Sequence, residues 1–322
     1  MTQGSITPQV DEPPLRLRGR LGQFSPRESL QGAAFILPAV VILATFLIYP
    51  VFWTLRLSLD RGRGLRFEQW VGLDNYRELL TEDPDFIDWH HFPPQGALVN
   101  NVTWMVLYTG LCLGLGLLLA VLAGRVRYER IAKSVVFVPM SIAATAVGVI
   151  WLFIYSPDKR IGIVNNIGGR LGFDPVSWVG DPNTVNYAII VAYVWFSTGF
   201  AMMVLSAALK GIPTDIVEAA RVDGAGEWSI FRRIIVPMIS LPISVVAIWL
   251  VINVIKVFDV IYIMTRGGPG GSSRVIAYSM IVETFENGRG GYGAAIAIFM
   301  LLLILPIMIF NIRRFRGERV VG

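Results

Sequence analysis

Four polar side chains recur at every third position of one apolar stretch, WLVINVIKVFDVIYIM, and could carry chemistry. They are Asn253, Lys256, Asp259 and Tyr262. Positions three apart stay near one face of a helix, so Lys256 and Asp259 can pair there. Because an ionisable group inside an apolar span is costly, it usually faces a bundle interior or a water-filled path. We therefore interpret this stripe either as an ion pair that fixes helix packing or as the lining of a path. Both interpretations weaken if Lys256 and Asp259 lie near the outer surface.

No other set of residues has the spacing of a catalytic or metal site. The sequence lacks the GxxxxGK(S/T) phosphate-binding loop, the HExxH and CxxC motifs, and the GxSxG nucleophile turn. Cys112 is the single cysteine, which excludes an intramolecular disulfide, and the adjacent His90 and His91 have the pattern of solvated loop residues. We expect no catalytic residue, metal site or bound cofactor in this chain.

The composition indicates a membrane protein. The chain has 322 residues, of which 54% are hydrophobic and 16% charged, and its mean hydropathy is +0.59. A soluble chain carries about 25% charged residues, so we expect an all-α integral membrane protein. A span needs roughly 20 apolar residues, and six runs qualify, at about 33–55, 98–123, 134–155, 187–208, 239–264 and 294–312.

The first run follows a polar arm, residues 1–31, which contains Pro and Gly and is expected to be disordered. The run is too long for the core of a signal peptide and lacks a clean cleavage site, so we interpret it as an uncleaved first span. The membrane domain then covers residues 32–316, and residues 317–322 form a short tail.

Basic residues set the predicted orientation, because they favour the cytosolic side of a membrane. Each of four segments carries four basic residues. They are Arg16, Arg18, Arg20 and Arg27; Arg125, Arg127, Arg130 and Lys133; Lys210, Arg221, Arg232 and Arg233; and Arg313, Arg314, Arg316 and Arg319. The acidic segment 56–97 falls on the opposite side. Both termini and the stretch 209–237 are therefore expected in the cytosol.

The stretch 209–237 is a long polar interval between two apolar runs. Pro213 and Thr214 are expected to open a helix, with Thr214 as its N-cap. Asp215 and Glu218 lie in the first turn, where the helix dipole favours acids. Gly224 then breaks the helix, since glycine tolerates the backbone of a sharp reversal.

The two short helices of this stretch have different faces. The first presents small side chains about one turn apart, at Ile216, Ala219 and Ala220. The second places Ile230, Phe231, Ile234 and Ile235 on one side and Arg232 and Arg233 on the other. Two short helices with different faces, joined by a glycine turn, indicate a docking surface rather than a linker.

Three motifs occur in order and on the predicted sides. The longest comprises Leu209-Lys210-Gly211-Ile212-Pro213, Glu218-Ala219-Ala220, Asp223-Gly224-Ala225 and Val236-Pro237. The others are Val71-Gly72-Leu73-Asp74-Asn75-Tyr76 after the first span and Thr265-Arg266-Gly267-Gly268-Pro269 after the fifth. Over about residues 33–316 the chain resembles the permease subunits of binding-protein-dependent ABC importers, in their carbohydrate-uptake branch, and the longest motif resembles their EAA loop. Val236 stands where leucine is usual, and Arg266 where a small residue is more common.

The resemblance implies a fold and a set of partners. The fold would be the six-span, type I ABC importer permease (MetI-like) fold in a bacterial or archaeal plasma membrane. The partners would be a second homologous permease, a pair of cytosolic ATPase subunits that bind ATP and Mg, and an extracytoplasmic substrate-binding protein. This chain would then not be an enzyme. The ATPase-coupling residues would be Thr214, Glu218, Ala219, Ala220, Asp223, Gly224, Ala225 and Gly226, with Glu218 as a polar anchor.

The carbohydrate branch implies an uncharged substrate such as an α-glucoside, an oligosaccharide or a related polyol. Such molecules are recognised by hydrogen bonds to hydroxyls and by stacking on aromatic faces. The path would be lined by the stripe of the fifth span and by Tyr193, Trp195 and Thr198 of the fourth, whose alternative is a packing or interfacial aromatic cluster. Glycerol-phosphate-type uptake is an alternative substrate class. A secondary transporter would need internal repeats and usually more spans.

Overall fold

The computed structural model describes residues 26–92 and 94–318, which are helical apart from loops and two isolated β-bridges. Contacts divide the chain into two units, Met1–Phe52 and Trp53–Gly322. The first unit contains α1 (Pro26–Leu43), η1 (Ala44–Ile48) and the beginning of α2 (Tyr49–Ser58). The expectation of a disordered arm through residue 31 is wrong at its end, because α1 begins at Pro26. Residues 1–25 and 319–322 of the predicted arm and tail lie outside the described part.

The first predicted span is confirmed as a long apolar helix, from Gly32 to Ser58. Its large apolar side chains, among them Phe35 and Phe46, are exposed. An exposed apolar helix of this length is suited to a membrane, where lipid or a partner subunit covers such side chains.

The core of the second unit is the pair α4 (Ala97–Ala123) and α8 (Val185–Lys210), which lie side by side. Small residues let their backbones approach closely, as is usual between membrane helices. A side-chain carbon on Gly116 would come within 2.7 Å of the Cβ of Ala201. The indole N–H of Trp104 donates to the Asn186 amide oxygen at 2.6 Å, which pairs these two buried polar groups across the seam.

The third and fifth predicted spans are broken rather than continuous, which corrects the ranges 134–155 and 239–264 as single helices. The third consists of α5 (Glu129–Phe137), η3 (Val138–Ser141) and α6 (Ala144–Ile154), with a bend of 101°. The fifth enters through α10 (Glu227–Ile230), η4 (Phe231–Ile235) and α11 (Val236–Met238), then bends by 69° into α12 (Ser240–Ile255). Pro139 and Pro237 lie beside these bends, where proline removes a helical hydrogen-bond donor.

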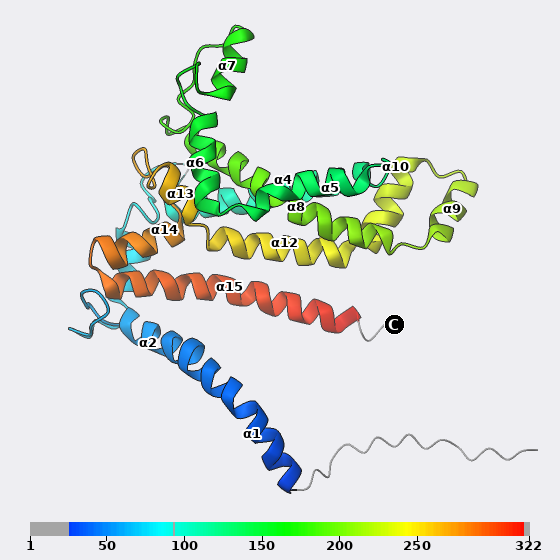
Figure 1. Cartoon of the computed structure of the whole chain (residues 1–322). Helices are drawn as coiled ribbons and strands as arrows, with labels where there is room; N and C mark the ends of the chain where they lie inside the picture. The colour runs from blue at the N-terminus through cyan, green and yellow to red at the C-terminus, as the bar shows by residue number, and fades with distance from the viewer. Residues whose placement is uncertain (1–25, 93, 319–322) are drawn as a thin grey trace, which may run out of the picture. The chain divides into compact units, whose positions relative to one another are not determined.

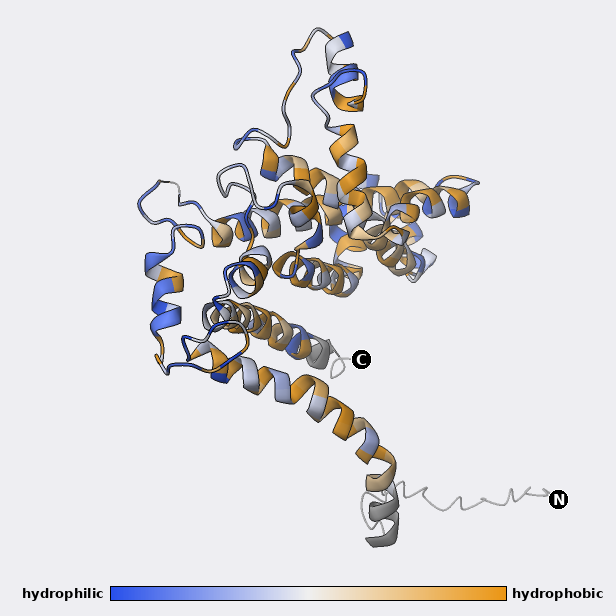
Figure 2. Cartoon of the chain, turned by 60° about the vertical axis from the view of Figure 1, so that its left-hand side comes forward, coloured by the Kyte–Doolittle hydropathy of each residue, from blue (hydrophilic) through white to orange (hydrophobic). Residues whose placement is uncertain are grey.

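The last span is α15 (Gly290–Glu318), which starts four residues before the predicted run and packs against α12. It follows α13 (Asp259–Met264), α14 (Ile276–Ile281) and η5 (Val282–Glu286). Within residues 26–92 and 94–318, four helices are long and apolar enough to cross a membrane, and up to six spans result if each bent pair counts as one. Figure 2 shows the long helices mostly in hydrophobic colours and the polar residues gathered in the connections.

Short elements carry the polar connections. On one side lie α3 (Asp74–Arg77), η2 (Glu78–Glu82) and α7 (Ile163–Arg170). On the other, α9 (Thr214–Val222) projects beyond the ends of α8 and α12 (Figure 1). The fold therefore separates α9 from α7, α13 and α14 by the length of the long helices.

Candidate functional site

The predicted helix–turn–helix of residues 209–237 is present. α9 begins directly after Pro213, whose extended backbone (φ −59°, ψ 130°) makes it the residue that caps the helix. Thr214 is therefore the first helical residue and not the N-cap, which corrects the prediction. Its Oγ1 lies 3.4 Å from Asp215 Oδ1 and makes no capping bond to the backbone.

The turn after α9 depends on Gly224, which has φ +81°. The Ala225 N–H donates to the Ala220 carbonyl at 3.0 Å, as in a glycine-terminated helix end. Across the turn, Arg221 Nε and Glu227 Oε1 form an ion pair at 2.7 Å. The reversal predicted at this glycine is thus confirmed in its backbone geometry.

The two faces of α9 have different surroundings. A cavity of about 610 Å³ lies between α9 and the ends of α4 and α8, and Val217, Glu218 and Arg221 line it. The part of α9 that does not line the cavity exposes Ile216, which is 42% exposed, and Val222, which is 87% exposed. Glu218 forms no hydrogen bond or ion pair within residues 26–92 and 94–318. The predicted polar anchor therefore lies on the cavity side, whereas apolar side chains occupy the outward face.

The remaining predicted coupling residues surround the same turn. Ala219 lies on the exposed side of α9 and Ala220 is half-buried. Asp223 and Gly226 are exposed, and Ala225 is half-buried. Small side chains at these positions leave the backbone of α9 accessible to a close contact.

The base of this loop is tied to the spans. Lys210, at the end of α8, pairs with Glu129 at the start of α5 at 2.7 Å, and Lys133 pairs with the same carboxylate. Ile230 is buried, so α10 is anchored through an apolar contact. Both ends of the helix–turn–helix are therefore held by contacts within this chain.

The stripe of the fifth span does not lie on one continuous helix, which corrects the prediction. α12 ends at Ile255, and α13 begins at Asp259. Asn253 donates to the Trp249 carbonyl of its own helix at 2.8 Å. Lys256 and Asp259 are both exposed and do not form the expected ion pair within the described structure.

Part of the stripe meets the aromatic cluster of the fourth span. The Tyr193 ring lies 5.2 Å from that of Tyr108 and 5.7 Å from that of Trp104. α13, which begins at Asp259, packs against α8, which carries Tyr193. The structure thereby brings the two elements that carry these predicted path residues against each other.

The other two residues of the fourth span lie apart from this pair. Trp195 is partly exposed, and its ring is 5.9 Å from that of Trp151. Thr198 is buried and donates to the Val194 carbonyl at 2.7 Å. Thr198 therefore packs against its own helix and does not face an open surface of this chain.

The sequence reading missed two aromatic residues beside Tyr262. The rings of Phe258 and Tyr262 stack with centroids 5.2 Å apart, and Tyr278 lies 6.4 Å from Tyr262. The spacing of four between Phe258 and Tyr262 could have indicated the first pair. Tyr278 follows the glycine-rich loop, and no local signal connects it to the stripe.

The glycine-rich loop after α13 closes over these rings. Arg266 has φ 49°, a left-handed backbone unusual for a residue with a side chain. Its carbonyl accepts from the Tyr278 hydroxyl at 2.6 Å, and its guanidinium lies 5.7 Å from the centre of the Tyr262 ring. A side-chain carbon on Gly267 would come within 2.7 Å of the Tyr278 ring, so only glycine fits there.

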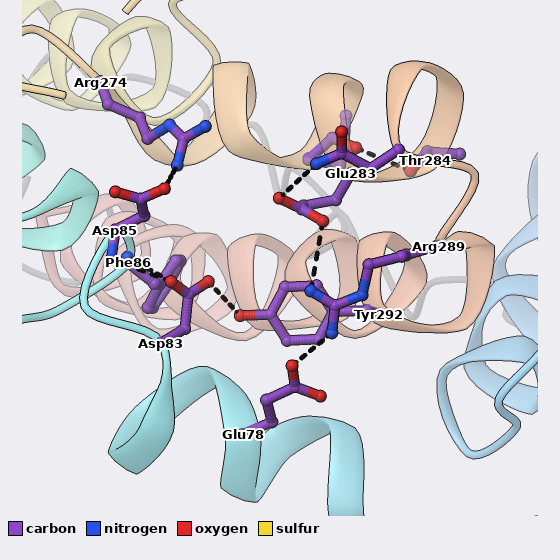
Figure 3. A network of polar contacts seen from close by, with 11 residues as sticks. Glu78, Asp83, Asp85, Phe86, Arg274, Glu283, Thr284, Arg289 and Tyr292 are labelled. Atoms are coloured by element: carbon purple, nitrogen blue, oxygen red, sulfur yellow. Dashed lines mark hydrogen bonds and ion pairs between the residues drawn. The ribbon is translucent and has the colours of Figure 1, made fainter. Parts of the chain in front are cut away.

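A polar network joins η2 and the loop after it to the start of α15 (Figure 3). Arg289 pairs with Glu78 and, at 3.4 Å, with Glu283. The Tyr292 hydroxyl donates to Asp83. The network fixes η2 and the loop after it against the start of the last span.

The histidine pair lies in the loop that follows this network. His91 Nδ1 is 2.5 Å from Asp88 Oδ2, and both histidines are exposed. The His90 backbone N–H and the His91 ring hold the pKa of the Asp88 carboxyl below its usual value. No group of three His, Cys, Asp or Glu residues in the described ranges is placed to bind a metal.

Comparison with known proteins adds independent findings. The family described as "Binding-protein-dependent transport system inner membrane component" matches residues 113–312. The osmoprotective compounds uptake permease protein GgtC of Synechocystis sp. is 44% identical over 88% of this chain and 98% of its own length. The alpha-glucoside transport system permease protein AglF of Rhizobium meliloti is 38% identical over 94% of this chain and 88% of its own.

A solved structure resembles the fold. It is a bacterial alginate ABC transporter in complex with an alginate pentasaccharide-bound periplasmic protein, and one of its chains aligns with a TM-score of 0.74. The alignment covers 88% of this chain and 93% of that chain at 24% identity. At this identity the likeness shows a shared fold.

Proposed function

The chain belongs to the family of binding-protein-dependent transport system inner membrane components, and from this premise we propose that it carries a sugar. It is a permease subunit of an ABC importer. The names of the two relatives support an α-glucoside, an oligosaccharide or a related polyol as substrate. They do not favour glycerol-phosphate uptake, and family membership excludes a secondary transporter.

The observation that carries the coupling role is the uncovered apolar face of α9. Val222 and Ile216 are exposed on α9, do not line the cavity, and belong to an element that projects beyond the ends of α8 and α12 (Figure 1). An exposed apolar surface on a polar loop is typical of a contact with another protein. We propose that this face docks on a cytosolic ATPase subunit, and that closure of the ATPase pair moves α9 and, through Lys210 and Ile230, the spans.

The proposed path runs along the surface that carries Lys256, Asp259 and Tyr262. Lys256 and Asp259 are exposed in the single chain, as residues between two permease subunits would be. Asp259 begins α13, which packs against the helix of Tyr193, and Phe258 stacks on Tyr262. A carboxylate beside aromatic rings offers both the hydrogen bonds and the flat apolar faces that sugars need. In this proposal a second permease completes the path.

The membrane location is established by family and span pattern, whereas the orientation is a proposal supported by the basic residues. We place both termini and α9 in the cytosol of a bacterium or archaeon. The glycine-rich loop then faces the extracytoplasmic binding protein. ATP and Mg would bind only in the separate ATPase subunits.

A reconstitution experiment tests this division of labour. The chain is assembled in proteoliposomes with its partner permease, its ATPase subunits and its binding protein, and labelled α-glucosides, polyols and glycerol phosphate are offered. We expect ATP-dependent accumulation of a sugar or polyol that requires the binding protein. Accumulation of glycerol phosphate alone would refute the substrate class, and ATP hydrolysis by this chain alone would refute the separation of the two functions.

A further inference from the structure

A second polar cavity lies at the opposite end of the molecule from α9. It has a volume of about 900 Å³ and lies between the loop 61–69 and the start of α15. The loop crosses directly over the helix, since the Gly64 N–H donates to the Gly288 carbonyl at 2.9 Å. A side-chain carbon on Gly290 would overlap the Gly64 carbonyl, so the close crossing requires glycine.

Three arginines line this cavity, and only one of them pairs with carboxylates of the described structure. Arg289 pairs with Glu78 and Glu283, and its guanidinium lies 4.1 Å from the centre of the Tyr292 ring (Figure 3). Arg61 and Arg63 also line the cavity, and their guanidinium groups form no hydrogen bond or ion pair within the described residues. Two free guanidinium groups two positions apart can bind one tetrahedral anion, because each presents a planar fork of donors.

The charge balance favours a ligand with a single negative charge. Arg289 forms a separate paired group with Glu78 and Glu283. The remaining charged groups of the lining are Arg61 and Arg63, with two positive charges, and Glu68, with one negative charge. A sugar fits less well, because Tyr292, the one aromatic residue in the described lining, has its ring covered by Arg289. A ligand with one phosphodiester group matches the surplus of one positive charge.

The position of the cavity indicates that its ligand comes from the membrane. The first span ends at Ser58, and the last begins at Gly290, so the cavity lies at the edge of the apolar layer. The same loop exposes Leu65, which is 59% exposed, and Trp70, which is 57% exposed. Arg56 lies 4.5 Å from the centre of the Trp70 ring. Basic and aromatic residues on one exposed loop are typical of the membrane interface.

We propose that this cavity binds the headgroup of an anionic phospholipid. Arg61 and Arg63 hold the phosphodiester, while Leu65 and Trp70 enter the interface beside the acyl chains. The site depends on the span boundaries and not on the sugar proposed above, so loss of lipid binding and loss of sugar uptake are separate outcomes.

The experiment uses the full-length chain, purified from membranes in mild detergent with its accompanying subunits. Native mass spectrometry measures the retention of phosphatidylglycerol and, separately, of phosphatidylethanolamine during titration. The test variant is Arg61→Gln with Arg63→Gln. The control is Arg66→Gln with Arg77→Gln, which removes the same charge from exposed arginines outside the cavity. Melting curves check that both variants remain folded.

We expect the test variant to bind phosphatidylglycerol about 30-fold more weakly, since each basic residue at a lipid headgroup contributes a factor of about five. The control is expected to change by less than about threefold, because a detergent micelle has no charged surface to attract distant arginines. If both variants lost phosphatidylglycerol binding equally, or if the test variant lost none, the proposed lipid site would be refuted. Equal retention of phosphatidylethanolamine would overturn the anionic selectivity. Displacement by millimolar inorganic phosphate would show a soluble-anion site in place of a lipid site.

Discussion

Replacement of Val222 by Asp is expected to release the ATPase subunit from α9 without unfolding the chain. The Val222 side chain is 87% exposed on the outward face of α9. If that face docks on the ATPase, the valine becomes buried on assembly. Surface substitutions that break no contact change stability by about 0.5 kcal/mol or less, so the effect should appear in the association and not in the melting temperature.

The expected loss of association free energy follows from the chemical groups that each substitution removes or adds. Val222→Ala removes two methyl-sized groups at about 0.8 kcal/mol each, which corresponds to roughly tenfold weaker association. Val222→Asp loses the same apolar burial and adds the cost of burying a carboxylate, so we expect a loss of about 3 kcal/mol, more than 100-fold. The order of the three side chains, Val, Ala and Asp, is itself a prediction.

The assay is a titration of the detergent-solubilised permease with the ATPase subunit, followed by ATP-driven uptake in proteoliposomes. Ile161→Asp is the control, because Ile161 is 55% exposed in a loop at the opposite end of the spans. Wild-type association of Val222→Asp would refute docking through this face. If Ile161→Asp weakened association equally, the effect would be a general consequence of surface charge.

The remaining predictions concern the cavity, the turn, the path and the outer loop. Glu218→Lys adds a fourth cation to a cavity already lined by three basic side chains, so uptake should fall at least about tenfold while the ATPase stays bound; unchanged uptake would contradict this. Gly224→Val should lose uptake because φ +81° excludes a branched side chain, whereas Gly224→Asn should retain it; the two variants behaving alike would refute the turn argument. Asp259→Ala should lower uptake rate or affinity about tenfold at unchanged stability, and unaltered uptake kinetics would remove Asp259 from the path. Asn75→Ala should cost about 2 kcal/mol of stability, since Asn75 is buried and donates to two backbone carbonyls; melting curves compare it with exposed Asn166→Ala, and equal curves would contradict the reasoning.

The features that could be predicted from the sequence are those that depend on neighbouring residues alone. An apolar run of sufficient length predicts a span wherever the chain packs, and the first, second, fourth and sixth runs each form one long helix. Gly224 predicts a reversal, because a positive φ is a property of that residue and its neighbours. Glu218 was expected on the docking face, but the face it occupies depends on how α9 rests on α4 and α8, which is a tertiary property.

The outer network could not be predicted, because its partners are distant in the sequence. Tyr292 and Asp83 lie 209 positions apart. The Asn75 amide donates to the carbonyls of Ser58 and Asp60, which explains the motif around Asn75 as a clamp on the end of the first span. A single sequence contains no signal that pairs such residues, although their polar types identify a structured loop.

The breaks in the third and fifth runs have a physical consequence for the path. Hydropathy is continuous across residues 239–264, so the run alone predicted an unbroken helix with Lys256 and Asp259 paired on it. The backbone leaves the helix at Lys256, and α12 before it spans only about 24 Å at 1.5 Å per residue. Non-helical backbone at membrane depth is tolerated only where protein or water covers it. In the proposed assembly, a partner permease or a water-filled path therefore covers the exposed surface at Lys256 and Asp259.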